Sequence, residues 1–184
     1  KVCKSTNVII PTYTCTDILD AVLQSNCNPI IVDCNKDLQI DFNEVKRYLQ
    51  IADTIIIPHM FGIRTPVEIY KKLNIKIIED LSQCHGLKKL GRYSDVTITS
   101  FNKSKWIDCN GGGMIWYDKK INNNYYKFNK NDLPFNLKNK FMSINKNLKI
   151  RREKAHEIIN SGISLIGSNI PNSWLRGMYF TNKP

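Results

Sequence analysis

Four short runs of β-branched residues recur along the first half of the chain, and their rhythm limits the folds that it can adopt. They are NVII (7–10), NPIIVDC (28–34), DTIIIPH (53–59) and IKIIED (75–80). Each run is apolar through its middle instead of alternating between apolar and polar residues. This pattern is typical of strands buried on both faces, as in parallel sheets that are covered by helices.

The segments between these runs have the spacing and the start signals of helices. Candidate helices follow a capping-type residue at 17–25 (after Thr16), 42–50 (after Asp41) and 66–73 (after Thr65). The third start is the clearest: Thr65 is placed to cap, Pro66 fits the first helical position and Glu68 stands where a capping-box acid reaches back. The sequence therefore predicts helices between the strands.

This alternation predicts an α/β fold of three layers, with a mostly parallel sheet flanked by helices. Two more strand candidates lie at 95–101 and 113–118, and a helix is expected from about Ser143 to Asn160. We divide the chain into a core (1–118), a polar surface excursion (119–142) and a C-terminal part (143–184). The buried part of the sheet should contain Ile9, Ile31, Val32, Ile56 and Ile77.

The composition fits one domain with a sizeable core, since 42% of the 184 residues are hydrophobic. The formal net charge of +11 is distributed unevenly. Residues 1–116 carry 14 basic and 12 acidic side chains, whereas residues 117–184 carry 13 and 4. The excess of basic residues in the last third of the chain is accompanied neither by interleaved aromatic and basic residues nor by the cysteine and histidine spacing of a zinc finger. We therefore predict a solvated basic face and no nucleic-acid partner.

The cysteines and the apolar runs indicate the cellular setting. No apolar run approaches the roughly 18 residues of a membrane helix, and no signal peptide opens the sequence, so we expect a soluble, cytoplasmic protein without a membrane partner. No C-x-x-C pair occurs, which indicates neither a disulfide framework nor a metal site. We therefore predict free thiols at the six cysteines, Cys3, Cys15, Cys27, Cys34, Cys84 and Cys109.

Polar residues directly after the strands are the candidates for chemistry, because ligands of open α/β sheets gather at the carboxyl ends of the strands. Asp80 ends one strand and is followed by Gln83, while Ser100 and Lys105 follow the next strand. A strand-terminal Asp also serves as a structural cap, so both roles stay open for Asp80. The glycines at 111–113 precede a strand, where they allow backbone to approach a ligand or another strand.

The order and spacing of these motifs resemble a known family. The motifs P-T-Y-T, P-H-M-F-G, I-I-E-D-L-S-Q-C-H-G and S-F-N-K-S-K-W-I-D-C-N-G-G-G are similar to those of the DegT/DnrJ/EryC1/StrS family of pyridoxal-phosphate sugar aminotransferases. The resemblance runs from about Asn7 to Tyr117. It implies that the core is the large domain of a fold type I aminotransferase, and that residues 143–184 are a helix and a remnant of the small domain.

The resemblance also implies a role for each matched residue. Lys105 matches the lysine that bonds to pyridoxal 5'-phosphate and later moves a proton, for which its amine must be neutral. Asp80 matches the acid that pairs with the pyridine nitrogen. Gln83 matches the residue beside the ring hydroxyl, and Ser100 matches a phosphate-binding hydroxyl. His85 is expected to shape the turn.

Two features depart from the pattern of the family. Cys15 stands near the position of a flat side chain that commonly covers the cofactor ring, with Tyr13 close by. The chain also starts after the phosphate-binding loop of the family and lacks most of its small domain. We therefore expect a fragment of a longer protein or a truncated relative.

The implied activity is transfer of an amino group from an amino acid, expected to be glutamate, to a keto group on a nucleotide-linked deoxysugar. The family setting implies amino-sugar biosynthesis for a surface polysaccharide and a homodimer. One alternative is a sugar dehydratase with the same cofactor, although such relatives replace the lysine at the position of Lys105 by histidine. The other alternative is a degenerate relative that binds a ligand or partner without catalysis.

Overall fold

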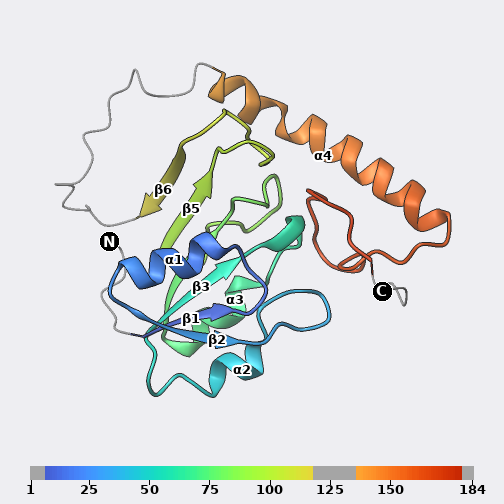
Figure 1. The fold of residues 1–184 in the computed structure, drawn as a ribbon. Helices are drawn as coiled ribbons and strands as arrows, with labels where there is room; N and C mark the ends of the chain where they lie inside the picture. Colours follow the sequence, from blue (N-terminus) through green and yellow to red (C-terminus); the bar gives the residue numbers. More distant parts are fainter. Residues whose placement is uncertain (1–6, 118–135, 180–184) are drawn as a thin grey trace.

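A six-stranded sheet forms the centre of the computed structural model, which describes residues 7–117 and 136–179 (Figure 1). The order is β2-β1-β3-β4-β5-β6, in which the first five strands are parallel and β6 is antiparallel to β5. The predicted α/β fold with a mostly parallel sheet is confirmed. The strands are β1 (Asn7–Pro11), β2 (Asn28–Val32), β3 (Thr54–Pro58), β4 (Lys76–Asp80), β5 (Val96–Ser100) and β6 (Gly113–Tyr117).

Helices cover both faces of the sheet, as the apolar runs of the strands require. One face packs against α1 (Thr16–Gln24), and the opposite face packs against α2 (Phe42–Lys46) and α3 (Val67–Tyr70). Two short 3-10 turns, η1 (Met60–Gly62) and η2 (Lys71–Leu73), lie in the connections. The long α4 (Leu137–Asn160) lies apart from these layers, beyond β5 and β6 (Figure 1).

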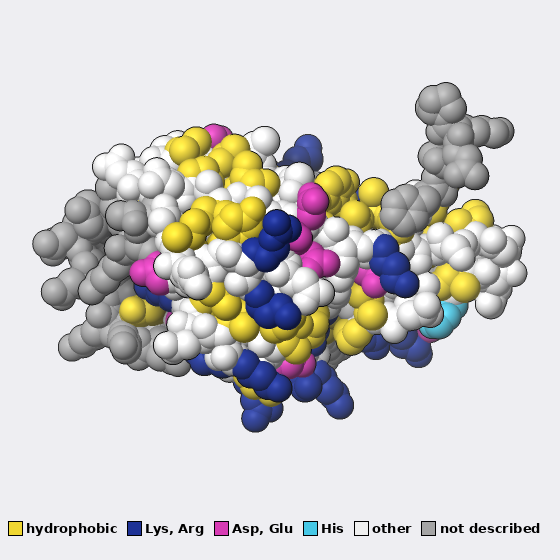
Figure 2. All heavy atoms as spheres, turned by 90° about the horizontal axis from the view of Figure 1, so that it is seen from below, with side chains coloured by type: hydrophobic (Ala, Val, Ile, Leu, Met, Phe, Trp, Pro, Cys, Tyr) yellow, Lys and Arg dark blue, Asp and Glu magenta, His cyan; other side chains and the backbone are white. Residues whose placement is uncertain are grey.

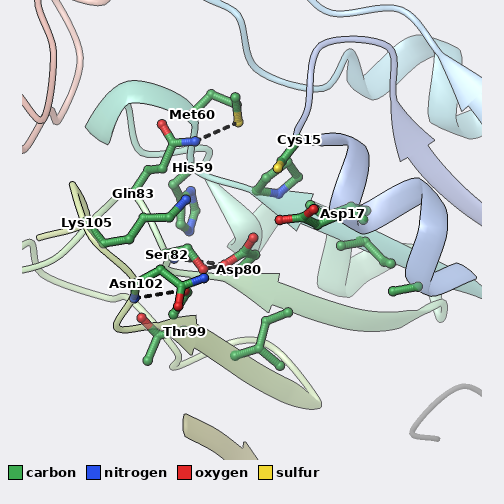
Figure 3. A pocket seen from close by; sticks show the side chains of 16 residues that line it. Cys15, Asp17, His59, Met60, Asp80, Ser82, Gln83, Thr99, Asn102 and Lys105 are labelled. Carbon is green, nitrogen blue, oxygen red and sulfur yellow. Dashed lines mark hydrogen bonds between the residues drawn. The ribbon is translucent and has the colours of Figure 1, made fainter. Parts of the chain in front are cut away.

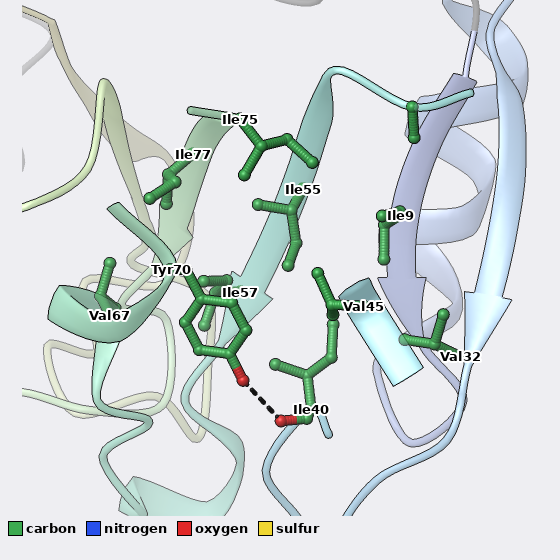
Figure 4. Close-up of a cluster of buried hydrophobic side chains, with 11 residues drawn as sticks. Ile9, Val32, Ile40, Val45, Ile55, Ile57, Val67, Tyr70, Ile75 and Ile77 are labelled. Atoms are coloured by element: carbon green, nitrogen blue, oxygen red, sulfur yellow. Dashed lines mark hydrogen bonds between the residues drawn. The ribbon is translucent and has the colours of Figure 1, made fainter. Parts of the chain in front are cut away.

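The larger apolar core lies between the sheet and the pair α2 and α3 (Figure 4). Alternate residues of the strands enter it, so that Ile55 and Ile57 of β3 are fully buried there beside Ile77 of β4. Tyr70 of α3 closes the cluster, and its hydroxyl donates a hydrogen bond of 2.7 Å to the Ile40 carbonyl. Because α2 and α3 are very short, this packing carries more stability than their internal hydrogen bonds.

The predicted cap of α2 is confirmed. The Asp41 carboxylate accepts hydrogen bonds from the backbone N–H groups of Asn43 and Glu44. The helix is shorter than predicted, ending at Lys46. Thr16, in contrast, lies inside α1 and does not precede it, since Cys15 is the N-cap residue and makes no side-chain capping bond.

The predicted cap of α3 is wrong. The helix begins at Val67 with Pro66 as the N-cap residue, and Thr65 makes no side-chain capping bond. Glu68 does not reach back to the helix start because Arg64 and Lys89 both donate hydrogen bonds to its carboxylate. Partial burial would raise the pKa of Glu68, but the hydrogen bonds from Arg64, from the backbone N–H of Glu68 itself and from Lys89 lower it to about 2.

The burial of the sheet follows the prediction except at its edge. Ile9, Val32, Ile56 and Ile77 are buried, whereas Ile31 is 54% exposed. Ile31 belongs to β2, an edge strand that has a neighbouring strand on one side only among the described residues. Position in the sheet, and not residue type, therefore decides its exposure.

The C-terminal helix ends at Asn160 as predicted but begins at Leu137, well before Ser143. Its buried residues are Leu148 and Ala155. Leu148 packs on a third cluster of buried residues in the loop that joins β5 to β6. Most of the predicted polar excursion lies outside the described residues.

Basic side chains do not form one continuous patch on the face that Figure 2 shows. They are interspersed with acidic and apolar side chains. Within residues 7–117 and 136–179, no helix combines the length and the apolar character that a membrane crossing needs. Free thiols are confirmed at Cys15, Cys34, Cys84 and Cys109.

Replacing Ile55 by Ala should lower the free energy of unfolding by about 2 to 5 kcal/mol, because the side chain is fully buried between the sheet and the two short helices. Ile31→Ala is the matched control, with an expected loss below about 1 kcal/mol at its exposed edge position. Urea denaturation of both variants measures the difference. Equal losses would contradict the placement of the two isoleucines.

Candidate active site

A cavity of about 230 Å³ lies where β3, β4 and β5 end, beside the first turn of α1 (Figure 3). The carboxyl ends of parallel strands are the usual ligand-binding edge of an open α/β sheet. The structure brings all four sequence-predicted site residues to this one cavity. They are Asp80, Gln83, Ser100 and Lys105.

Asp80 is the last residue of β4, and its two carboxylate oxygens have different surroundings. Oδ1 accepts hydrogen bonds from the backbone N–H of Ser82, at 2.8 Å, and from the Ser82 hydroxyl. Among the described residues, none donates a hydrogen bond to Oδ2. One oxygen therefore anchors the turn after the strand and fixes the carboxylate, which leaves the other oxygen for a ligand.

Gln83 joins two parts of the cavity wall. Its Oε1 accepts a hydrogen bond of 2.9 Å from the backbone N–H of Phe61 in η1, and its Nε2 lies 3.6 Å from the Met60 sulfur. Phe61 has φ of 55°, in the left-handed region that non-glycine residues seldom adopt. The contact with Gln83 helps to hold this conformation, so the turn after β4 and η1 are fixed to each other.

Lys105 lies in the loop between β5 and β6, and its side chain enters the cavity (Figure 3). The next two residues, Trp106 and Ile107, are buried in the cluster beneath α4 and anchor the loop. Lys103 is exposed and is not part of the cavity lining. The structure thus places Lys105, and not the nearby Lys103, at the cavity.

The end of β5 supplies the remaining polar wall. The Ser100 hydroxyl accepts a hydrogen bond of 3.3 Å from the backbone N–H of Asn102, and both residues line the cavity. Gly113 of β6 pairs with Ser100, and a Cβ atom there would lie 2.6 Å from the Thr99 carbonyl oxygen. This confirms that a glycine allows close backbone approach here, and the partner is a strand.

The α1 side of the cavity carries Cys15 and Asp17 (Figure 3). Tyr13 is not part of the lining; it packs on Phe61, with ring centroids 5.7 Å apart. Of Cys15 and Tyr13, only Cys15 lines the cavity. Asp17 does not stand out in the sequence as a site residue, because an Asp at a helix start is common in proteins of any function.

A buried polar pair supports the cavity, and the sequence analysis gave it no role. His59 is 1% exposed and Glu79 is fully buried, with 2.8 Å between His59 Nε2 and Glu79 Oε1. His59 Nδ1 accepts the backbone N–H of Thr65, at 3.0 Å, so the hydrogen-bond pattern assigns the ring proton to Nε2. The Gly91 N–H donates to the second Glu79 oxygen. The sequence feature that could have indicated this pair is Glu79 within the otherwise apolar run IKIIED, because a carboxylate buried in a strand requires hydrogen-bond donors.

His85 is buried behind β5 and is not part of the cavity lining. Its Nε2 lies 3.1 Å from the Thr99 hydroxyl. Burial, with a smaller contribution from His59, lowers the pKa of His85 to about 4. This histidine is therefore neutral in the folded protein at neutral pH.

Comparison with known proteins places most of the chain in one family. The model of the DegT/DnrJ/EryC1/StrS aminotransferase family matches residues 1–151. A 3-oxo-glucose-6-phosphate:glutamate aminotransferase of Bacillus subtilis is 31% identical over 141 aligned positions, and the match covers 72% of this chain and 32% of that protein. A GDP-perosamine synthase of Escherichia coli O157:H7 is 29% identical over 118 aligned positions, and the match covers 59% of this chain and 32% of that protein. The chain thus spans about a third of the length of these relatives.

Solved structures share the fold at low sequence identity. A GDP-4-keto-6-deoxymannose-3-dehydratase variant with bound GDP-perosamine superposes with a TM-score of 0.79 and 14% identity, over 99% of this chain and 61% of that chain. NtdA of Bacillus subtilis, with bound cofactor PMP, has a TM-score of 0.73 and 24% identity, over 95% of this chain and 49% of that chain. These structural similarities show that this chain shares the fold of the two proteins.

The lowered pKa of His85 predicts a loss of stability in acid. Between the ordinary histidine pKa of about 6.5 and a pKa of about 4, the unfolded chain binds a proton that the folded chain does not. The free energy of unfolding should therefore fall as the pH falls through this range, by on the order of 3 kcal/mol. Denaturant titrations of His85→Gln should lack this decrease, because Gln can still bond Thr99 but does not titrate. An unchanged slope in the variant would contradict it.

Proposed function

The chain belongs to the DegT/DnrJ/EryC1/StrS aminotransferase family, and from this membership we propose that its cavity holds pyridoxal 5'-phosphate and that the protein transfers an amino group to a keto sugar. Aminotransferases of this family are transferases that depend on pyridoxal phosphate. One observation carries the proposal for this chain. Lys105 and Asp80 line the same cavity, and Asp80 Oδ2 accepts no hydrogen bond from the described residues.

The donor set of the cavity fits the cofactor chemically. When bound, pyridoxal phosphate supplies an aldehyde and an electron-accepting ring. The Lys105 amine would bond to the aldehyde, and Asp80 Oδ2 would accept the ring N–H. The Gln83 amide would lie beside the ring hydroxyl, and Ser100 and Asn102 offer polar groups for the phosphate.

The chain's own residues would act by charge, proton transfer and exclusion of water. Ser82 holds Oδ1 of the Asp80 carboxylate and thereby fixes the position of the negative charge that the carboxylate would present to the ring. Lys105 Nζ would take a proton from the substrate carbon and return it, which requires the amine in its neutral form. Cys15 and the start of α1 close the opposite wall, and this position suits a side chain that shields the reacting groups from water.

The substrate class is the finer part of the proposal. We propose a nucleotide-linked keto-deoxysugar as acceptor, which the GDP-perosamine synthases among the relatives support. We propose glutamate as donor, which the name of the Bacillus subtilis relative supports. Assembly as a homodimer, a cytoplasmic location and a role in surface polysaccharide belong to the same proposal and come from the family resemblance of the motifs.

Dehydration of a sugar with the same cofactor is the second candidate. A dehydratase of this fold superposes on nearly the whole chain. The family resemblance disfavours this candidate, since the dehydratases carry histidine where this chain has Lys105. A chain that binds no cofactor would instead favour a noncatalytic relative.

Borohydride reduction after incubation with pyridoxal phosphate should attach a pyridoxyl group to Lys105. Lys105→Ala should abolish the adduct, because the other lysine of the motif, Lys103, points to solvent. Lys103→Ala is the matched control and should keep the adduct. Peptide mass spectrometry locates the modified residue, and an adduct on Lys103 would overturn the site assignment.

Asp80→Asn should reduce the transamination rate by orders of magnitude while the protein stays folded. The Asn oxygen can still accept the Ser82 N–H, so stability should fall by about 1 kcal/mol or less. The lost charge removes the partner of the protonated ring nitrogen. Ser82→Ala is the control: it removes a hydrogen bond to Asp80 but keeps the charge, and should retain most activity. Equal rates for Asp80→Asn and the unchanged protein would leave Asp80 a turn cap only.

A further inference from the structure

After α4 the chain turns back and lies beside the segment that follows β3 (Figure 1). We call residues 171–176 of this segment the C-terminal strap. The strap pairs with the segment after η1: the Arg64 N–H donates to the Pro171 carbonyl at 2.9 Å, and Ile63 and Asn172 form a bridge. The strap is thus attached to the part of the chain that follows β3.

The tightest contact lies between Ser173 of the strap and Gly62 of η1. The Ser173 N–H donates to the Gly62 carbonyl at 2.7 Å, and the Ser173 hydroxyl lies 3.3 Å from the same oxygen. Gly62 has φ of 92°, and a Cβ atom there would lie 2.5 Å from Ser173 Oγ. Only glycine fits at this position without movement of the strap.

The same hydroxyl also reaches the loop that carries Lys105. Trp106 donates a hydrogen bond of 3.1 Å from its indole nitrogen to Ser173 Oγ. Arg151 of α4 lies over the Trp106 ring, 4.7 Å from its centroid, and donates hydrogen bonds to the carbonyls of Trp174 and Leu175. Trp106 is therefore held between the strap and α4.

One buried hydroxyl thus connects the two walls of the cavity. On one side, Trp106 follows Lys105 directly in the sequence. On the other side, Gly62 follows Phe61, whose N–H binds the Gln83 side chain. Ser173 is fully buried, so its hydroxyl makes these contacts out of reach of bulk water.

We infer that Ser173 is a positioning residue that sets the separation of Lys105 and Gln83 across the cavity. The inference rests on the proposed function for the meaning of these two residues. Without the hydroxyl, the buried indole N–H of Trp106 has lost its acceptor, which favours movement of the loop. The amine of Lys105 then samples positions away from the ring-binding residues, and a misplacement of about 1 Å can slow a reaction up to a hundredfold.

Amide hydrogen exchange without cofactor tests the connection itself. Ser173→Ala should speed exchange in peptides from both walls, 59–63 and 101–109, because the contacts of its hydroxyl with Gly62 and Trp106 are lost. The strap itself should stay in place, since the backbone N–H of Ser173 still donates to Gly62. Ser168→Ala removes an exposed hydroxyl from the same C-terminal segment and should change neither wall. Faster exchange in the strap alone, or in neither wall, would overturn the inference.

Cofactor attachment tests the consequence. Ser173→Ala should slow the attachment of pyridoxal phosphate to Lys105 by about tenfold or more, measured by borohydride trapping over time. Trp106→Phe removes the same hydrogen bond from its other end and should reproduce the effect. The double variant should be no slower than the slower single variant, since both remove one interaction. Fully additive effects, or an unchanged rate in Ser173→Ala, would contradict the positioning role.

The two tests separate the inference from the proposed function. If the unchanged protein attaches no pyridoxal phosphate at Lys105, the proposed function fails. The exchange experiment still decides whether Ser173 connects the walls.

Discussion

The buried carboxylate of Glu79 is the constraint on which the arrangement around the cavity depends. It lies fully buried inside β4, where an unpaired charge would destabilise the fold by several kcal/mol. His59 and Gly91 donate to its two oxygens, so the ends of two connections must meet this strand at fixed points. Side chains alternate along a strand, so Glu79 fixes the register that presents Asp80 to the opposite face and to the cavity.

The loops that form the walls of the cavity are also held by polar contacts. The backbone N–H of His59 donates a hydrogen bond of 3.3 Å to the Asp80 carbonyl and thereby continues the pairing of β3 with β4 beyond the strands. Gln83 fixes η1 through Phe61, and Ser173 joins η1 to the loop of Lys105. Each contact is local, but together they set the positions of side chains from distant parts of the sequence.

The sequence was sufficient for the parts that depend on local pattern. Apolar runs identified the strands, and motif spacing placed Lys105 and Asp80 at the same sheet edge. Three features depended on tertiary neighbours and were not predictable: Ile31 is exposed because β2 became the edge strand, Thr65 does not cap because its N–H binds His59, and the strap reaches Gly62 across more than a hundred residues. For Ile31 and the strap, neighbours distant in the sequence override the local preference, whereas for Thr65 the partner is His59, six residues earlier.

The two readings of Asp80 that the sequence left open are compatible in the structure. Turn capping uses Oδ1, which Ser82 holds from both its backbone and its hydroxyl. The proposed contact with a ring nitrogen would use Oδ2. Capping also prepares the proposed contact, because a carboxylate that is already oriented loses less conformational freedom when it binds. A structural role for a strand-terminal acid is therefore no argument against a functional role, since the first orients the group that the second requires.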